Sequence, residues 1–217
     1  MNETITTETL LLLLLKGGWV MLPIIILSIF AIYIIIDRWM ALKKANSTPI
    51  AWLEEVEAML YLEDVKNIKA LCHQRTSAIQ RMVGACIDNL GKPRQNMEAV
   101  IEDAGKQEIY ALEKTLSFLG TIAGAAPMIG FLGTVLGMIQ TFMAIAGETG
   151  HVSPQLLSEG IYKAMITTAA GLIVGIIAYI GYNYLLTRIE QVAHSLETTA
   201  REFLELCKFT KKGAVKK

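Results

Sequence analysis

The sequence has no acidic residue in its three long uncharged stretches, 17–36, 115–147 and 164–187. It has only 3 cysteines and 3 histidines, and their spacing does not match the ligands of a metal site. Its 20 basic residues are balanced by 20 acidic ones, so charge gives no support for nucleic-acid binding. No histidine cluster, nucleophile–base pair or phosphate-binding loop appears, so we expect no enzymatic activity, no metal and no other cofactor.

The three uncharged stretches are long enough to cross a lipid bilayer. A hydrocarbon core of ~30 Å requires about 20 helical residues at ~1.5 Å each. The whole chain is 53% hydrophobic, with a mean hydropathy of +0.44, and no alternating strand pattern is present. The sequence therefore predicts an all-α membrane protein with three transmembrane helices.

The positions of the basic residues predict the orientation. The segment 37–114 carries 11 Lys and Arg residues and the segment 188–217 carries seven, whereas 148–160 carries none. Because basic residues accumulate on the cytoplasmic side, the N-terminus is expected outside and the C-terminus inside. The expected order is an interfacial segment 1–18, transmembrane helix 19–36, cytoplasmic helical segment 37–114, transmembrane helix 115–147, periplasmic loop 148–160, transmembrane helix 161–187 and cytoplasmic helical tail 188–217.

Helical periodicity extends beyond the apolar stretches. In the central segment, helices are expected over 49–61, 63–73 and 76–90. From Gln95 no helix breaker occurs before the second apolar stretch begins, which predicts a single helix of about 50 residues that continues through that stretch. The third transmembrane helix is expected to continue to about Phe209.

Small and weakly polar residues recur on one face of the second and third stretches. Their spacing of three and four residues is that of a helix face. Such a face suits close helix packing or the lining of a cavity, and the spacing alone favours packing. The two sets are Pro127, Gly130, Thr134, Gly137 and Thr141 in the second stretch, and Ala164, Thr168, Gly171, Gly175, Ala178 and Tyr182 in the third.

Two charged residues precede the third stretch. Glu159 and Lys163 have the i, i+4 spacing and the order that favour a helical ion pair. We expect an ion pair at the membrane interface rather than a proton relay. Pro127, inside the second stretch, is expected to kink or loosen its helix.

Two motifs carry a family resemblance. One is Pro127-x-x-Gly-x-x-Gly-Thr-Val-x-Gly137, and the other is Thr168-Ala-x-Gly-Leu172. Together with the three-span topology, they closely resemble the MotA/TolQ/ExbB proton-channel family. The chain length, and the segment Leu-Leu-Lys-Gly-Gly-Trp before the first span, are more similar to its ExbB/TolQ branch.

The resemblance implies a homopentamer in the bacterial inner membrane. Its second and third helices would surround a pore holding the dimer of an ExbD/TolR-type single-span partner. The partner's membrane aspartate would carry the proton, which agrees with the absence of an acid here. Thr134 and Thr168 match the family's pore threonines, so at these two positions the resemblance favours pore lining over packing. The other candidate residues of the proton pathway are Thr141, Pro127, Gly137 and Gly171.

One position departs from the family. Lys163 stands where better-known ExbB proteins carry a glutamate near the outer end of the third helix, and Glu159 lies one turn before it. A role of the family's glutamate therefore does not transfer to this chain.

The function that the resemblance implies is that of a stator subunit. It would convert the proton motive force into mechanical work for TonB-dependent transport, with a TonB-like protein as a further partner. When the partner aspartate loses its proton it would seek Thr134 and Thr168 of the next subunit, whereas its neutral form tolerates an apolar surface. The alternatives are a TolQ-like subunit of an envelope-maintenance or gliding motor, with a TolA-like partner, or a passive helical membrane scaffold.

Overall fold

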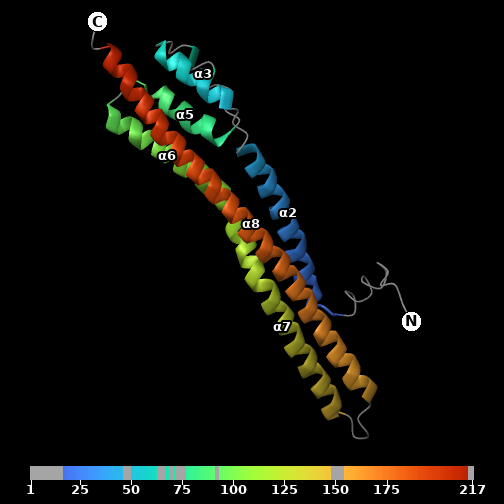
Figure 1. Cartoon of the computed structure of the whole chain (residues 1–217). Helices are drawn as coiled ribbons and strands as arrows, with labels where there is room; N and C mark the ends of the chain where they lie inside the picture. The colour runs from blue at the N-terminus through green and yellow to red at the C-terminus, as the bar shows by residue number, and fades with distance from the viewer. Residues whose placement is uncertain are drawn as a thin grey trace. The chain divides into compact units, whose positions relative to one another are not determined.

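The computed structural model describes residues 17–45, 50–62, 67–68, 71, 77–90, 93–147 and 154–214. Within these ranges the regular structure is entirely helical, as predicted (Figure 1). The helices are α2 (Met21–Ala45), α3 (Ile50–Tyr61), α5 (Ala78–Asp88), α6 (Arg94–Glu113), α7 (Leu116–Gly147) and α8 (Pro154–Ala214).

Three helical segments are long and apolar enough to cross a membrane, which agrees with the predicted number of spans. They are Met21–Ala45, Gln95–Gly147 and Leu157–Cys207, with mean hydropathies of 2.1, 1.9 and 2.0 over their most apolar windows. Large apolar side chains on these helices are exposed, among them Ile29 at 63% and Ile180 at 63%. An exposed apolar surface of this kind requires lipid or another membrane chain as its neighbour.

The shorter predicted helices agree with the structure where they can be compared. The prediction over 49–61 corresponds to α3 and the prediction over 76–90 to α5. The predicted helix over 63–73 lies mostly outside the described residues. The start of α5 is stabilised by a capping box, in which the Ser77 hydroxyl accepts from the Gln80 backbone N–H and the Gln80 side chain accepts from Ser77 N–H.

The long helices agree with the prediction in the second span and differ from it before the third. The helix expected to start near Gln95 is present as a helical segment of 53 residues, Gln95–Gly147, in which a turn at Lys114–Thr115 separates α6 from α7 while Lys114 keeps α-helical dihedrals (φ −47°, ψ −43°). Helix α8 begins at Pro154, so residues 154–160, expected in the outer loop, are helical. Proline suits the first position of a helix because its fixed φ is helical and no N–H is needed there.

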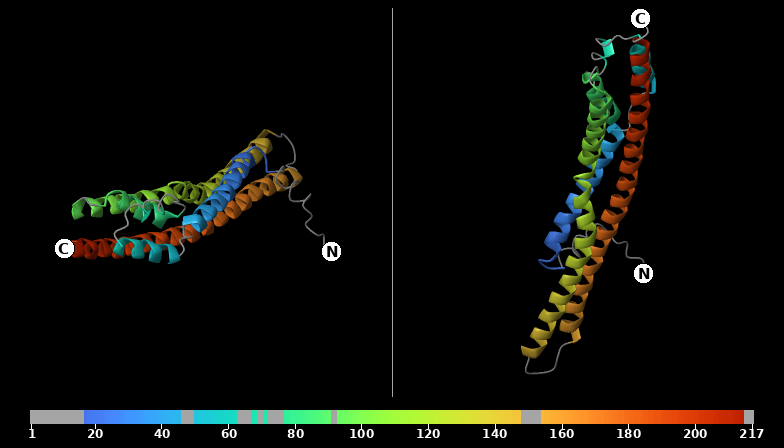
Figure 2. Two further views of the ribbon diagram at one scale, coloured as in Figure 1. Left: turned by 90° about the horizontal axis from the view of Figure 1, so that it is seen from above. Right: turned by 90° about the vertical axis from the view of Figure 1, so that its left-hand side faces the viewer.

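The chain divides into two compact units. The first, which we call the apolar unit, comprises Met1–Ile36 and Ser117–Asn183, and the second, the polar unit, comprises Asp37–Leu116 and Tyr184–Lys217. In the apolar unit α7 and α8 run antiparallel and side by side, as both views in Figure 2 show. Helix α2 joins this pair, where Ile35 packs beside Gly181.

In the polar unit, α5 packs against α6. Gly105 lets the Met82 sulfur approach the α6 backbone, and the buried side chains of Met82 and Ile101 contribute to the core. Arg81 donates to both carboxylate oxygens of Glu108, through Nε at 2.6 Å to Oε1. This bidentate pair fixes the register of α5 on α6 and raises the pKa of Arg81.

Cys86 on α5 is fully buried in the polar unit. Burial raises the pKa of its thiol to about 12, and the nearby Cys207 adds to this shift. Because only the thiolate is strongly nucleophilic, the folded protein should hold Cys86 in an unreactive form at neutral pH.

This burial predicts a slow alkylation of Cys86. In a Cys72→Ser, Cys207→Ser variant, iodoacetamide at pH 8 should react with folded protein more than about 100-fold more slowly than with denatured protein, where the thiol pKa is ~8.5. Mass spectrometry of timed samples measures the rate. Equal rates in the two states would show that α5 does not bury this side chain.

Candidate functional site: the α7–α8 seam

Helices α7 and α8 approach each other through small residues on both sides. Gly175 packs on Pro127, Gly171 on Ala126 and Gly130, Ala164 on Gly137, and Gly160 on Thr141. We call this row of contacts the α7–α8 seam. The two helices are antiparallel in this seam, because residues later in α7 contact residues earlier in α8.

The seam leaves no room for side chains at its glycines. A β-carbon at Gly171 would lie 2.5 Å from the Ala126 carbonyl oxygen, and one at Gly175 would lie 2.5 Å from Cγ of Pro127. Close backbone approach of this kind is the main way that membrane helices gain packing energy, since lipid provides no hydrophobic drive between them. The small residues of the two predicted faces therefore pack against each other within the chain.

Thr134 and Thr168 lie opposite each other in the seam. The Thr134 hydroxyl donates to the Ala164 carbonyl at 3.2 Å, and the Thr168 hydroxyl donates to the Gly130 carbonyl at 3.1 Å. The two hydroxyls also lie within hydrogen-bond reach of each other, and either could be the donor in that bond. Each hydroxyl thus has a backbone carbonyl of the opposite helix as an acceptor, and a hydroxyl that donates to the other threonine gives up its carbonyl bond.

This arrangement fixes what the threonines can offer to a ligand. A hydroxyl has one proton and two lone pairs, so a hydroxyl that donates to a carbonyl can still accept but cannot donate again. Both threonines are only partly buried.

The other predicted site residues also lie on the seam. Thr141 is 6% exposed and its hydroxyl donates to Gly137 O of its own helix at 2.8 Å. Gly171 is buried, whereas Pro127 and Gly137 are partly buried. Helix α7 continues through Pro127 without a break. The six residues predicted for the proton pathway therefore all lie along the seam, from Pro127 to Thr141 on α7.

Sequence reasoning gave no role to Thr167, which is 2% exposed. Its hydroxyl donates to Ala164 O at 2.8 Å, and its side chain fills the space beside Gly133, where Val20 of the chain before α2 also packs. Consecutive helical residues point about 100° apart. Two consecutive threonines in the sequence could therefore have indicated that their hydroxyls face different neighbours. Thr168 faces the seam, and Thr167 faces Gly133 and Val20.

The predicted ion pair between Glu159 and Lys163 is present, at 3.0 Å. Both side chains are largely exposed, at 67% and 48%. They line a cavity of about 640 Å³ together with Trp19, Gln140 and Thr141. An exposed pair with zero net charge is typical of an interface and unlike the desolvated groups of a proton relay.

The residues that form the seam offer hydroxyls and carbonyls but no carboxylate, and Glu159, the acid next to Gly160 at one end of the seam, is exposed and paired with Lys163. Within the described residues, no cluster of His, Cys, Asp or Glu is arranged to hold a metal ion. The polar groups of the seam can therefore bind a proton carrier but do not themselves titrate near neutral pH.

Comparison with known proteins places this site in a family context. A profile of the MotA/TolQ/ExbB proton channel family matches residues 70–198. The chain is 30% identical over 177 residues to the putative biopolymer transport protein ExbB-like 1 of Synechocystis sp., covering 80% of this chain and 69% of that protein. It is 27% identical over 195 residues to the Tol-Pal system protein TolQ of Pseudomonas aeruginosa, covering 85% and 84%.

A shorter match, 35% identical over 94 residues, is to the biopolymer transport protein exbB1 of Vibrio cholerae, and the chain spans only 41% of that relative. The helices define a membrane protein with three spans, and the matched profile covers the seam residues of both α7 and α8. The chain belongs to the MotA/TolQ/ExbB proton channel family, in its ExbB/TolQ branch.

The close approach at Gly171 predicts that even one methyl group is harmful there. Gly171→Ala should lower the free energy of unfolding by about 1–3 kcal/mol, because the β-carbon meets backbone atoms that cannot move aside. Gly124→Ala on α7 is the matched control, since nothing lies within 4 Å of the added carbon. Unfolding in mild detergent measures both, and equal stability of the two variants would contradict the seam.

Proposed function

We propose that this chain is the stator subunit of a proton-driven motor in the bacterial inner membrane. The observation that carries the proposal is a seam with two paired threonine hydroxyls, in a chain that has no acid in its uncharged stretches 115–147 and 164–187. A member of a proton channel family that has no titratable group at its polar membrane site needs that group from another chain. The partner is a single-span protein of the ExbD/TolR type with an aspartate in its span.

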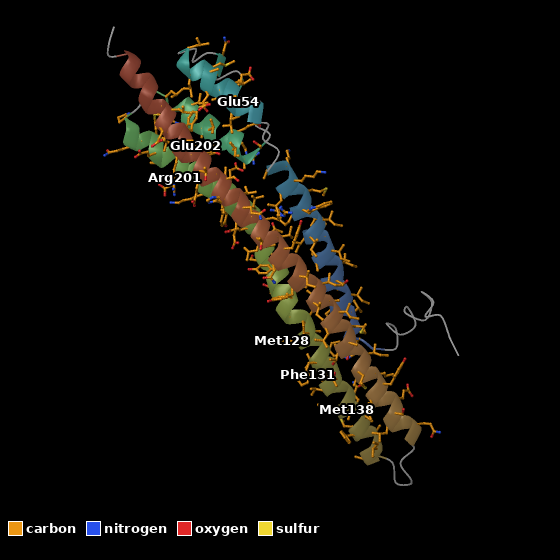
Figure 3. The ribbon with its side chains drawn as sticks, in the orientation of Figure 1. Glu54, Met128, Phe131, Met138, Arg201 and Glu202 are labelled. Carbon is orange, nitrogen blue, oxygen red and sulfur yellow. The ribbon has the colours of Figure 1, made fainter. Side chains whose placement is uncertain are left out.

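The assembly that fits this role is a homopentamer. The second and third spanning helices of each subunit, α7 and α8, surround a pore that holds a dimer of the partner. Met128 and Phe131 support such contacts, because they are 74% and 64% exposed and project from α7 on the side away from α8 (Figure 3). The accumulation of basic residues in 37–114 and 188–217 supports a periplasmic N-terminus and a cytoplasmic C-terminus.

The hydrogen bonds of the threonines set the order of events. A neutral partner aspartate can donate its proton to the free lone pairs of Thr134 or Thr168 without disturbing the seam. A charged aspartate needs a donor, so a threonine has to release the carbonyl of the opposite helix. That carbonyl keeps its backbone hydrogen bond within its own helix, which makes the exchange local.

This exchange couples proton flow to motion. Protonation lowers the free energy of the aspartate at an apolar surface, so the partner is free to move along the pore wall. Deprotonation makes it bind the threonines of the next subunit. Repetition around the ring turns the partner, and the long helices of the polar unit hold the ring against the reaction force.

The process that the motor drives is proposed first to be TonB-dependent transport, because the relatives from Synechocystis sp. and Vibrio cholerae are named as biopolymer transport proteins. A TolQ-like role in envelope maintenance or gliding is the second candidate, supported by the match over 84% of the Pseudomonas aeruginosa TolQ. The two differ in the outer protein that receives the motion, TonB-like or TolA-like.

The threonines should be necessary for proton flow. Thr134→Val and Thr168→Val each remove a hydroxyl of nearly unchanged shape, and each should lower proton flux into proteoliposomes of the partner complex about 10- to 100-fold. That factor corresponds to a hydrogen bond to a charged group, ~1.5–3 kcal/mol. Thr168→Ser should keep most of the flux because it keeps the hydroxyl.

Thr121→Val is the matched control. Thr121 lies on the same helix, but its hydroxyl is exposed and donates to Ser117 O of its own helix at 3.1 Å. The proton flux of the Thr121→Val complex should equal that of the unaltered complex. Full flux in the two valine variants, with the assembled complex intact by mass, would favour the passive scaffold instead.

A further inference from the structure

A basic cavity lies in the polar unit, where α2 and α8 leave their uncharged stretches. It has a volume of about 400 Å³, within the ~300–1,000 Å³ of small-molecule sites. The buried side chains of Leu42 and Val192 contribute to its lining. The rest of the lining consists of Trp39, Lys43, Tyr184, Arg188 and Gln191.

Arg188 is held in place by neutral groups. Its guanidinium lies over the Tyr184 ring, 5.4 Å from the centroid, and donates to the Tyr184 hydroxyl at 3.4 Å and to Gln191 Oε1 at 3.0 Å. Of the five N–H donors of a guanidinium, three make these bonds, so two remain for a ligand. The side chain is therefore oriented, yet its charge is not neutralised by the groups that hold it.

Lys43 adds a second uncompensated charge. Within the described part of the chain, its ammonium makes no ion pair or hydrogen bond. Arg38, five residues earlier on α2, differs because it is paired with Asp37 at 2.7 Å and donates to Ala111 O at 2.9 Å. The cation that lines the cavity is thus available, whereas its neighbour on the same helix has a structural role.

Two other cavities differ in charge. The cavity of about 640 Å³ in the apolar unit contains Glu159 beside Lys163, so its net charge is zero. A cavity of about 500 Å³ between α6 and α8 contains three glutamates, Glu98, Glu102 and Glu197, beside Lys106 and Arg201. The cavity of Lys43 and Arg188 has two cations and no carboxylate in its lining.

The position along the helices points to the source of the ligand. Trp39 follows the first uncharged stretch by one turn, and Tyr184 lies in the last turn of the third stretch. Both rings are about half exposed, at 56% and 50%, as is typical of aromatic residues at the level of lipid headgroups. Basic pockets between helices at this level suit the phosphate of an anionic lipid.

We propose that this cavity binds the headgroup of an anionic phospholipid. The phosphodiester accepts hydrogen bonds from Arg188 and Lys43, the two aromatic rings flank the glycerol region, and the acyl chains follow the apolar surface of α2. A bound lipid would fix α2 to α8 at the membrane boundary. The proposal does not depend on the proton mechanism.

Trp39 itself provides the probe. The full-length Trp19→Phe, Trp52→Phe variant has Trp39 as its only tryptophan. It is reconstituted in vesicles of phosphatidylcholine and phosphatidylglycerol, with brominated acyl chains on one lipid at a time. Brominated phosphatidylglycerol should quench Trp39 several-fold more than its share of the lipid predicts, and brominated phosphatidylcholine should quench it less.

Variants that remove one positive charge test whether the preference for phosphatidylglycerol arises in this cavity. Lys43→Gln and Arg188→Gln should each lower the preference for phosphatidylglycerol about fivefold, which corresponds to ~1 kcal/mol per cation. Arg188→Lys should keep most of it. Lys44→Gln removes the same charge from the next residue of α2, which does not line the cavity, and should change the preference less than about twofold.

A Trp39→Phe, Trp52→Phe variant, which reports from Trp19 at the other end of α2, should show no lipid preference. Equal quenching of Trp39 by both lipids, or equal losses in Lys43→Gln and Lys44→Gln, would overturn the proposal in favour of general surface charge. Displacement of the preference by inorganic phosphate, but not by chloride at the same ionic strength, would overturn it in favour of a free anion.

Discussion

The close contact between α7 and α8 is the constraint on which the rest of the apolar unit depends. Glycines on both helices bring the backbones so near that the two threonine hydroxyls reach carbonyls of the opposite helix. In lipid, no hydrophobic drive holds helices together, so this approach and these bonds supply the packing. The same residues therefore have a structural role and form the polar site of the unit.

That dual role limits the chemistry available to one chain. A seam built from glycines and threonines has no space for a carboxyl side chain. A buried acid without a partner would also be unfavourable in the membrane. In the proposed function, a proton site built on such a seam is completed by an acid from a second protein. The single proton of each threonine then distinguishes the neutral acid, which can donate to it, from the charged acid, which has to compete with a carbonyl.

Much of this could be predicted from the sequence, because it depends on composition and spacing. The three spans, the helices α3 and α5 and the Glu159–Lys163 pair follow from uncharged length, breakers and the i, i+4 rule. The turn at Lys114–Thr115 could not be predicted, because neither residue is a helix breaker. Thr167 was missed because helical spacing identifies one face, and a second face becomes visible only when Val20 and Gly133 are placed around it. Spacing also could not separate packing from pore lining, since both need small residues.

The central claim is that this chain forms a ring around a partner that brings the acid. It is tested most directly by the native mass of the complex purified in a mild detergent, with and without co-expression of the candidate single-span partner. The account predicts five copies of this 23.9 kDa chain holding two of the partner. A monomer or dimer whose mass does not change with the partner would contradict it.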